Sequence, residues 1–228
     1  MIFSNSNCLY IAIVGDIKSS KKIENRAEIQ NNLMLTLERI NEKYKDDIAS
    51  KFIVTLGDEF QGLLCKGYNI MNILQEIERK MYPTKIRFGI GIGRITTKIN
   101  SEMSLGADGP GYYKAREAID YLKRNEKKKQ MISSDTRVEV ECDNKNTMIL
   151  LNSMLSLITV LKESWSDRQR EIILDMLEHQ DNQIEAAKRL QVTQPTIQKS
   201  LARGNYFIYK DAVDTIEKVL SEIGGENV

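Results

Sequence analysis

The chain has 228 residues, of which 41% are apolar, so it can bury a substantial core in one large domain or in one medium and one small domain. Its 33 basic and 32 acidic side chains nearly cancel, which excludes a global electrostatic attraction to nucleic acid or to an anionic membrane. Three cysteines without a CxxC spacing predict reduced thiols and a cytoplasmic location rather than a disulfide framework.

The sequence opens with a strand pattern followed by a helix pattern. Residues 8–15 form a nearly continuous apolar run rich in β-branched side chains, which is typical of a central strand, and Asp16 ends it. Apolar residues then recur at spacings of three and four over 22–45, which predicts an amphipathic helix, with Ser19 and Ser20 as candidate N-caps.

Two further strands, a helix and a glycine-rich strand follow. The stretch TLGDEFQGLL predicts a turn at Gly57 and Asp58 between the strand patterns KFIVTL and FQGLLC. A helical stripe over 70–81 ends before Pro83, because the residue preceding a proline resists helical geometry. In the strand at 85–95, alternate glycines leave one face bare, so another segment can approach it closely.

A loop with the sequence GADGPG leads into a predicted helix over 111–125, and the segments 130–135 and 136–141 supply late strand patterns. The order begins strand, helix, strand, strand, helix, strand, which is the βαββαβ order of a ferredoxin-like sheet. The expected fold class is therefore α/β (α+β), with a ferredoxin-like palm domain over 1–143.

Only helical patterns follow the palm. A buried helix is predicted over 147–163, and its apolar segment, 148–161, has 14 residues. A bilayer requires roughly 20, so no membrane partner is expected. The segment 144–164 is therefore predicted to be a helix that links the two domains or forms a dimer interface. The remainder, 165–228, is predicted to be all-α: a helix capped by Ser166, then two short helices joined by a tight turn, which is the layout of a helix-turn-helix.

The second short helix carries polar and basic side chains of the kinds that contact base edges and phosphates in a major groove. The candidate DNA contacts are Gln194, Thr196, Gln198, Lys199 and Arg203. From Trp165 onward the chain has 8 basic and 11 acidic residues, which argues against tight DNA binding by a monomer. A homodimer would place two modules on one duplex, and it is the expected assembly.

Two acidic residues far apart in the sequence are expected to meet at one end of the sheet. Asp16 ends the first strand, and Asp58 lies in the hairpin between the second and third strands, which lie next to the first in a ferredoxin-like sheet. Two carboxylates beside a helix start that carries Ser19 and Ser20 suit Mg²⁺ (or Mn²⁺) and a polyphosphate. In outline this is a two-metal phosphoryl-transfer geometry.

Four segments resemble class III nucleotide cyclases and GGDEF diguanylate cyclases in their order and approximate spacing, over about residues 8–125. They are IAIVGDIKSS, VTLGDEFQGLL, RFGIGIGRITT and GPGYYKAREAI. With the C-terminal helices included, the chain is identified as a member of the SatD family.

The cyclase resemblance implies roles for particular residues. It implies that Asp16 and Asp58 are catalytic metal ligands, with the Ile17 carbonyl as an extra ligand, and that Glu59 matches the GGDEF glutamate of the catalytic set. A phosphate contact is implied for Arg116, and Lys114 is a second candidate for such a contact.

Some positions depart from the cyclase pattern. Val54 stands where class III cyclases place a base-reading lysine, Leu56 stands where GGDEF enzymes have a second glycine, and the transition-state asparagine is missing. The expected function is a palm protein that binds a nucleoside triphosphate or related nucleotide with Mg²⁺, either as a divergent nucleotide cyclase or nucleotidyltransferase or as a nucleotide sensor. The alternative is a catalytically inactive DNA-binding regulator whose palm serves ligand binding or dimerisation. The sequence leaves open whether the chain is an enzyme.

Overall fold

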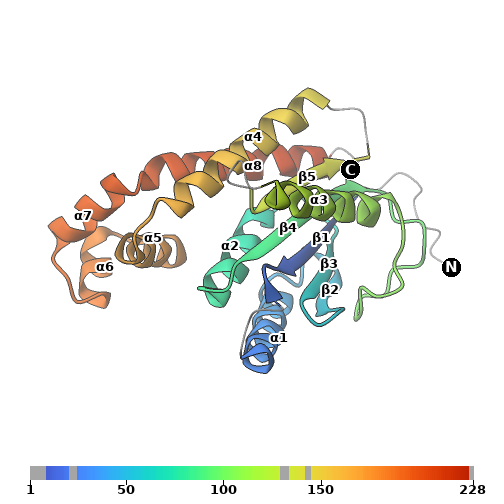
Figure 1. Ribbon diagram of the computed structural model, residues 1–228, viewed down its shortest axis with the longest axis horizontal. Helices are drawn as coiled ribbons and strands as arrows, with labels where there is room; N and C mark the ends of the chain where they lie inside the picture. The colour runs from blue at the N-terminus through green and yellow to red at the C-terminus, as the bar shows by residue number, and fades with distance from the viewer. Residues whose placement is uncertain (1–8, 21–24, 129–133, 142–144, 226–228) are drawn as a thin grey trace.

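The computed structural model describes residues 9–20, 25–128, 134–141 and 145–225, and in them a five-stranded sheet is flanked by helices (Figure 1). The strands are β1 (Tyr10–Ile17), β2 (Ile48–Val54), β3 (Glu59–Leu64), β4 (Ile86–Gly93) and β5 (Thr136–Val140). The helices of the first half are α1 (Arg26–Lys43), α2 (Ile70–Met81) and α3 (Pro110–Lys127). The later helices are α4 (Lys145–Glu163), α5 (Asp167–His179), α6 (Gln183–Arg189), α7 (Gln194–Arg203) and α8 (Tyr206–Gly225).

The strand order in the sheet is β2-β3-β1-β4-β5. β1 is antiparallel to both of its neighbours, β3 pairs antiparallel with β2, and only the added strand β5 is parallel, to β4. The first four strands and the helices between them thus have ferredoxin-like topology, which confirms the predicted α+β fold class.

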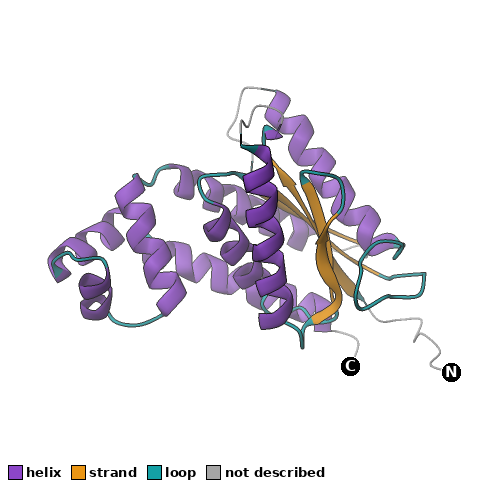
Figure 2. Cartoon of the chain, turned by 90° about the horizontal axis from the view of Figure 1, so that it is seen from below, coloured by secondary structure: helices purple, strands orange, loops and turns teal. Residues whose placement is uncertain are grey.

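The residues of β1 show how the two faces of the sheet are covered. Ile11 and Ile13 belong to a core cluster with residues of α1 and α2, whereas Ala12 and Val14 belong to a cluster with residues of α3. Because successive strand residues point to opposite faces, α1 and α2 cover one face and α3 covers the other (Figure 2).

The alternate glycines of β4 lie against α3. A Cβ atom added at Gly89 would lie 2.3 Å from the carbonyl oxygen of Ala115, and one added at Gly91 would lie 2.0 Å from the carbonyl oxygen of Gly111. The predicted close approach to this bare strand face is confirmed, and the segment that approaches is α3.

Two local predictions in the first half are wrong or lie partly outside the described residues. α1 begins at Arg26 after Asn25, so Ser19 and Ser20 lie upstream of its N-terminus and do not cap it. Residues 134 and 135 of the expected strand 130–135 are not in a strand, and the rest of that segment lies outside the described residues.

The C-terminal helices continue the core of the palm. One cluster of buried apolar residues runs from β1, α1 and α2 into α4, α5, α7 and α8. Ser166 caps α5, as predicted, and the structure adds a reciprocal capping box with Gln169. Glu217 of α8 caps α2 by accepting from the backbone N–H groups of Ile70 and Met71 at 2.9 and 2.6 Å. Within the described residues, no helix has the length and hydropathy needed to cross a bilayer.

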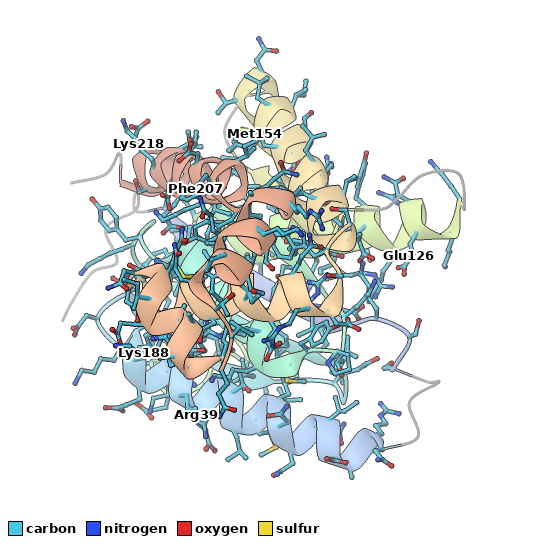
Figure 3. The ribbon with its side chains drawn as sticks, turned by 90° about the vertical axis from the view of Figure 1, so that its left-hand side faces the viewer. Arg39, Glu126, Met154, Lys188, Phe207 and Lys218 are labelled. Atoms are coloured by element: carbon cyan, nitrogen blue, oxygen red, sulfur yellow. The ribbon has the colours of Figure 1, made fainter. Side chains whose placement is uncertain are left out.

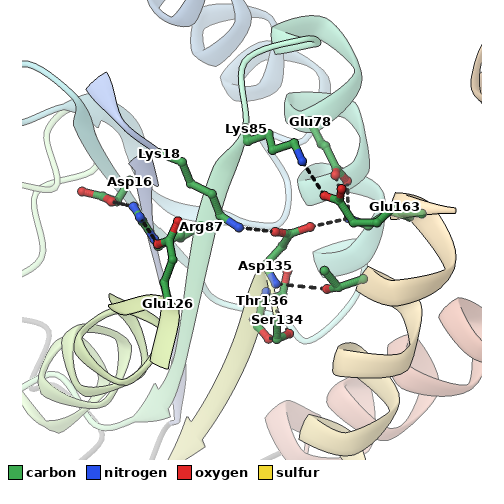
Figure 4. Close-up of polar contacts among 12 residues, drawn as sticks. Asp16, Lys18, Glu78, Lys85, Arg87, Glu126, Ser134, Asp135, Thr136 and Glu163 are labelled. Atoms are coloured by element: carbon green, nitrogen blue, oxygen red, sulfur yellow. Dashed lines mark hydrogen bonds and ion pairs between the residues drawn. The ribbon is translucent and has the colours of Figure 1, made fainter. Parts of the chain in front are cut away.

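Buried ion pairs join the palm to α4 (Figure 4). Lys162, which is 8% exposed, lies 2.6 Å from a carboxylate oxygen of Glu78 on α2 and 3.4 Å from one of Asp135, just before β5. Asp135 also pairs with Lys18, in the loop after β1, at 2.5 Å. Burial alone lowers the pKa of Lys162 and raises that of Asp135, but the opposite charges outweigh it, so the lysine pKa is raised and the aspartate pKa is lowered.

The packing of α3 on β4 predicts a large cost for a single methyl group. We expect Gly91→Ala to destabilise the fold by about 3 kcal/mol or more, because the new carbon would overlap backbone atoms that cannot rotate away. Gly106→Ala is the control: its Cβ would meet no atom within 4 Å, so only the strain of a φ of +87° remains, about 1 kcal/mol. Urea unfolding of both variants measures the difference, and equal costs would contradict the tight contact.

The buried pairs predict a pH dependence of stability. At neutral pH we expect Asp135→Asn to cost about 3 kcal/mol, because it leaves the buried ammonium of Lys162 with one carboxylate fewer. The folded-state pKa of Asp135 is lowered, so its contribution is present above the unfolded-state pKa of about 4 and is lost as pH falls through the folded-state pKa.

The stability gap between wild type and Asp135→Asn should therefore shrink below about pH 4, as followed by urea unfolding at a series of pH values. Asp108→Asn, at an exposed aspartate, is the control and should give no such gap. A gap that stays constant down to pH 3 would rule out the ion pairs as its cause.

Candidate functional site

The ladder between β1 and β3 brings the two predicted aspartates to one end of the sheet. Asp16 pairs with Glu59 in the register of the two strands, and the next step of the ladder is a hydrogen bond of 3.0 Å from the Ile17 N–H to the Asp58 carbonyl oxygen. Gly57 makes the turn possible with a φ of +64°. The backbones of Asp16 and Asp58 are therefore neighbours, although 41 residues separate them in the chain.

The Asp16 side chain lies between two cations on the α3 side of the sheet, and Figure 4 shows the contact with one of them, Arg87. One carboxylate oxygen is 2.5 Å from Arg87 of β4, and the other is 2.7 Å from Lys123 of α3. Arg87 also donates to Glu126 of α3 at 2.8 Å. The Asp16 side chain is only 7% exposed, and its two basic partners are not among the predicted site residues.

The Asp58 side chain has a different partner. It accepts a hydrogen bond from the hydroxyl of Ser20, in the loop after β1. Ser20 is buried, whereas the adjacent Ser19 is exposed and has a φ of 55°. The structure thus brings Ser20 to Asp58, while Asp16 is engaged by residues of β4 and α3.

Glu59 and Arg116, both predicted site residues, contact each other. Arg116 lies 3.1 Å from the Glu59 carboxylate and donates to the side chain of Gln61 at 3.2 Å. Lys114 is directed elsewhere and pairs with Glu117 on its own helix at 2.8 Å. Arg116 therefore lies over β3 on the α3 side of the sheet, and Lys114 does not join it.

The donor set at this end of the sheet consists of hard oxygens, which suits Mg²⁺ or Mn²⁺. Asp16 and Asp58 offer carboxylates and Ile17 a backbone carbonyl, and basic side chains next to them suit phosphate oxygens. Among the residues that the structure describes, no group of three or more acidic, histidine or cysteine side chains converges as a ready metal cluster. Asp16 and Asp58 therefore fit a metal ion as ligands, provided that they give up their present side-chain partners when the ion binds.

The predicted DNA contacts lie on α7, which follows α6 after a turn at residues 190–193. Ile197 and Leu201 are buried against neighbouring helices, and Thr193 occupies the N-cap position without a side-chain cap bond. All five candidates are exposed: Gln194, Thr196, Gln198, Lys199 and Arg203. At spacings of three and four, Thr196, Lys199 and Arg203 share one helical face.

A pocket of about 610 Å³ lies between α2 and the C-terminal helices, and the buried side of α7 contributes Leu201 to its lining. Gln75, Leu177, Tyr206 and Phe207 are among its lining residues. Figure 3 shows the molecule from the C-terminal helical end and marks Phe207 on α8. None of the predicted site residues lines this pocket, so its size alone does not connect it with the acidic residues of the sheet.

Solved structures with a similar fold include nucleotide cyclases. A bacterial light-regulated adenylyl cyclase is 16% identical, with a TM-score of 0.42, over 57% of this chain and 75% of that chain. The catalytic core of a rhodopsin-guanylyl cyclase with converted specificity, in complex with ATPαS, is 16% identical, with a TM-score of 0.34, over 48% of this chain and 70% of that one.

Comparison with curated proteins gives no match. A comparison with protein-family models does give one, described as the SatD family, over residues 10–218. That span contains the whole sheet, the ion pairs around Asp16 and Lys162, and the helices α5 to α7. The match confirms the resemblance noted in the sequence, and the chain belongs to the SatD family.

Proposed function

We propose that the palm binds a nucleoside triphosphate together with a divalent cation at the end of β1, and that it acts as a nucleotide sensor. The observation that carries this proposal is the buried Asp16 carboxylate, set beside the Asp58 backbone and surrounded by Arg87 and Lys123. Carboxylates suit the cation, and the basic side chains suit a polyphosphate.

In this proposal the chain's own residues divide the ligand between them. Asp16, Asp58 and the Ile17 carbonyl would hold Mg²⁺ or Mn²⁺, which when bound neutralises phosphate charge. Arg116, with Ser19 and Ser20, would contact phosphate oxygens, and Lys114 is the weakest member of this set because it pairs with Glu117.

A sensor is favoured over an enzyme by the positions that depart from the cyclase pattern. Catalysis of phosphoryl transfer depends on groups that are already placed for the developing charge. Val54 stands in place of the base-reading lysine of class III cyclases, and their transition-state asparagine is missing. A divergent nucleotide cyclase or nucleotidyltransferase remains the enzymatic alternative, with Asp16, Asp58 and Glu59 as its catalytic set.

The nucleotide proposal predicts a loss of binding in two variants. We expect wild type to bind a nucleoside triphosphate in the presence of Mg²⁺ or Mn²⁺, and Asp16→Asn and Asp58→Asn to bind at least about tenfold more weakly, because each removes a charged ligand of the cation. Calorimetric titration with ATP, GTP, CTP and UTP measures this. Glu102→Gln, at an exposed glutamate paired with Lys51, is the control and should bind like wild type.

The same preparations separate the two functional classes. Pyrophosphate release that Asp58→Asn abolishes would replace the sensor with an enzyme. Saturable binding without turnover supports the sensor. Absence of binding for all four nucleotides would overturn the proposal and leave the palm as a structural or dimerisation module.

A second candidate function is DNA binding by a helix-turn-helix made of α6 and α7. DNA binding would then be the response that the nucleotide sensor controls. The supporting observation is the exposed face of α7 that carries Thr196, Lys199 and Arg203, with Gln194 and Gln198 beside it. α4 adds support for a homodimer, since Leu150 and Leu157 lie two turns apart and are 67% and 68% exposed. The thiol of Cys65 is free. Because free thiols are typical of proteins in a reducing compartment, the proposed location is the cytoplasm.

DNA binding predicts a particular salt dependence. We expect Lys199→Ala with Arg203→Ala to weaken binding of a labelled duplex and to reduce the slope of log affinity against log salt by about 1.8, because two phosphate contacts are lost. The matched control is Lys45→Ala with Lys66→Ala, which removes the same charge from exposed positions of the palm. An equal change in both double variants, or no binding by wild type at low salt, would overturn DNA binding.

Sedimentation of wild type as a single chain at all concentrations would overturn the dimer.

A further inference from the structure

Asp16, Arg87, Lys123 and Glu126 form a connected series of ion pairs with two acids and two bases, which we call the Asp16 cluster. Each carboxylate oxygen of Asp16 has its own cation, Arg87 on one and Lys123 on the other. The protein itself thus places two positive charges at the Asp16 carboxylate, which the proposed function assigns to a metal ion.

The two cations differ in how firmly they are held. Arg87 is 11% exposed, extends from the buried strand β4, and is fixed on its other side by Glu126. Lys123 is 38% exposed and meets Asp16 through a single ammonium contact from α3. A partly exposed lysine with a flexible stem leaves its partner at small cost, whereas a buried arginine held on two sides does not.

Lys123 also stands in competition with a divalent ion. An ammonium group and a metal ion would bind the same carboxylate oxygen, and like charges at such a distance repel each other strongly in a partly buried site. Once released, the ammonium on its four-carbon stem stays close to the end of β1, where the phosphates of a nucleotide would lie.

We propose that Lys123 is an exchangeable internal cation: it occupies Asp16 in the ligand-free protein and moves to a phosphate oxygen when a metal-nucleotide binds. This inference rests on the proposed nucleotide function. It assigns Lys123 two opposite effects, because the residue opposes binding of the metal alone and favours binding of the metal with its nucleotide.

The test compares Lys123→Met with wild type in two calorimetric titrations. Methionine keeps the apolar stem and removes the charge, and Lys123→Gln serves as a second variant that keeps a polar end. We expect the affinity for Mn²⁺ alone to rise about three- to tenfold and the affinity for ATP or GTP in saturating Mn²⁺ to fall by a similar factor. Lys127→Met, at an exposed lysine one turn further along α3, is the matched control and should change neither affinity.

The outcomes separate this inference from the proposed function. If wild type binds Mn²⁺-nucleotide but both Lys123 variants match it in the two titrations, the exchange is wrong and the nucleotide site stands. If both affinities fall together, Lys123 is an ordinary ligand contact and the exchange is again wrong. If neither wild type nor the variants bind Mn²⁺ or nucleotide, both proposals fail. Near-ultraviolet circular dichroism of each variant checks that the fold is intact.

Discussion

The contact between the palm and the C-terminal helices depends on the ion pairs made by the buried ammonium group of Lys162. A charge in a low-dielectric interior is stable only when it is paired, so Glu78 of α2 and Asp135 before β5 must both be in place. The C-terminal end of α4 is thereby fixed both to α2 and to the segment just before β5. Arg170 of α5 also donates to the Lys162 carbonyl oxygen, so the first helix of the C-terminal group is anchored at the same point.

The same ion pairs connect this anchor to the candidate site. Asp135 also binds Lys18, which follows Ile17 directly at the end of β1. Lys18, Asp135 and Lys162 thus form a continuous series of contacts from the loop after β1 to the end of α4. If a nucleotide binds at the end of β1, as proposed, these contacts and the packing of α5 against α7 connect it physically with the exposed face of α7.

Local patterns predicted most of the elements, because they are set by neighbours in the chain. The limits of α2 follow from its apolar spacing and from Pro83, and the bare face of β4 follows from alternation of glycine. The start of α1 was predicted wrongly because Ser20 looks like a cap in the sequence, yet its hydroxyl is engaged by Asp58. A tertiary partner 38 residues away thus overrode a local signal.

The candidate site was predictable only in part for the same reason. Asp16 and Asp58 could be placed at one end of the sheet from topology alone. Arg87 and Lys123 could not, because their contact with Asp16 depends on the register of β4 beside β1 and on the rotation of α3 over the sheet. The sequence signal for Arg87 is a charged residue in an otherwise apolar strand, since such a residue needs a buried partner.

The cap that Glu217 places on α2 bears on the order in which the protein matures during synthesis. The N-terminal half leaves the ribosome first, but the first N–H groups of α2 at Ile70 and Met71 receive their carboxylate only from α8, almost 150 residues later. Until α8 docks, these N–H groups can bond only to water in place of the Glu217 carboxylate. Docking of α8 therefore completes the N-terminal end of a helix that was synthesised well before it.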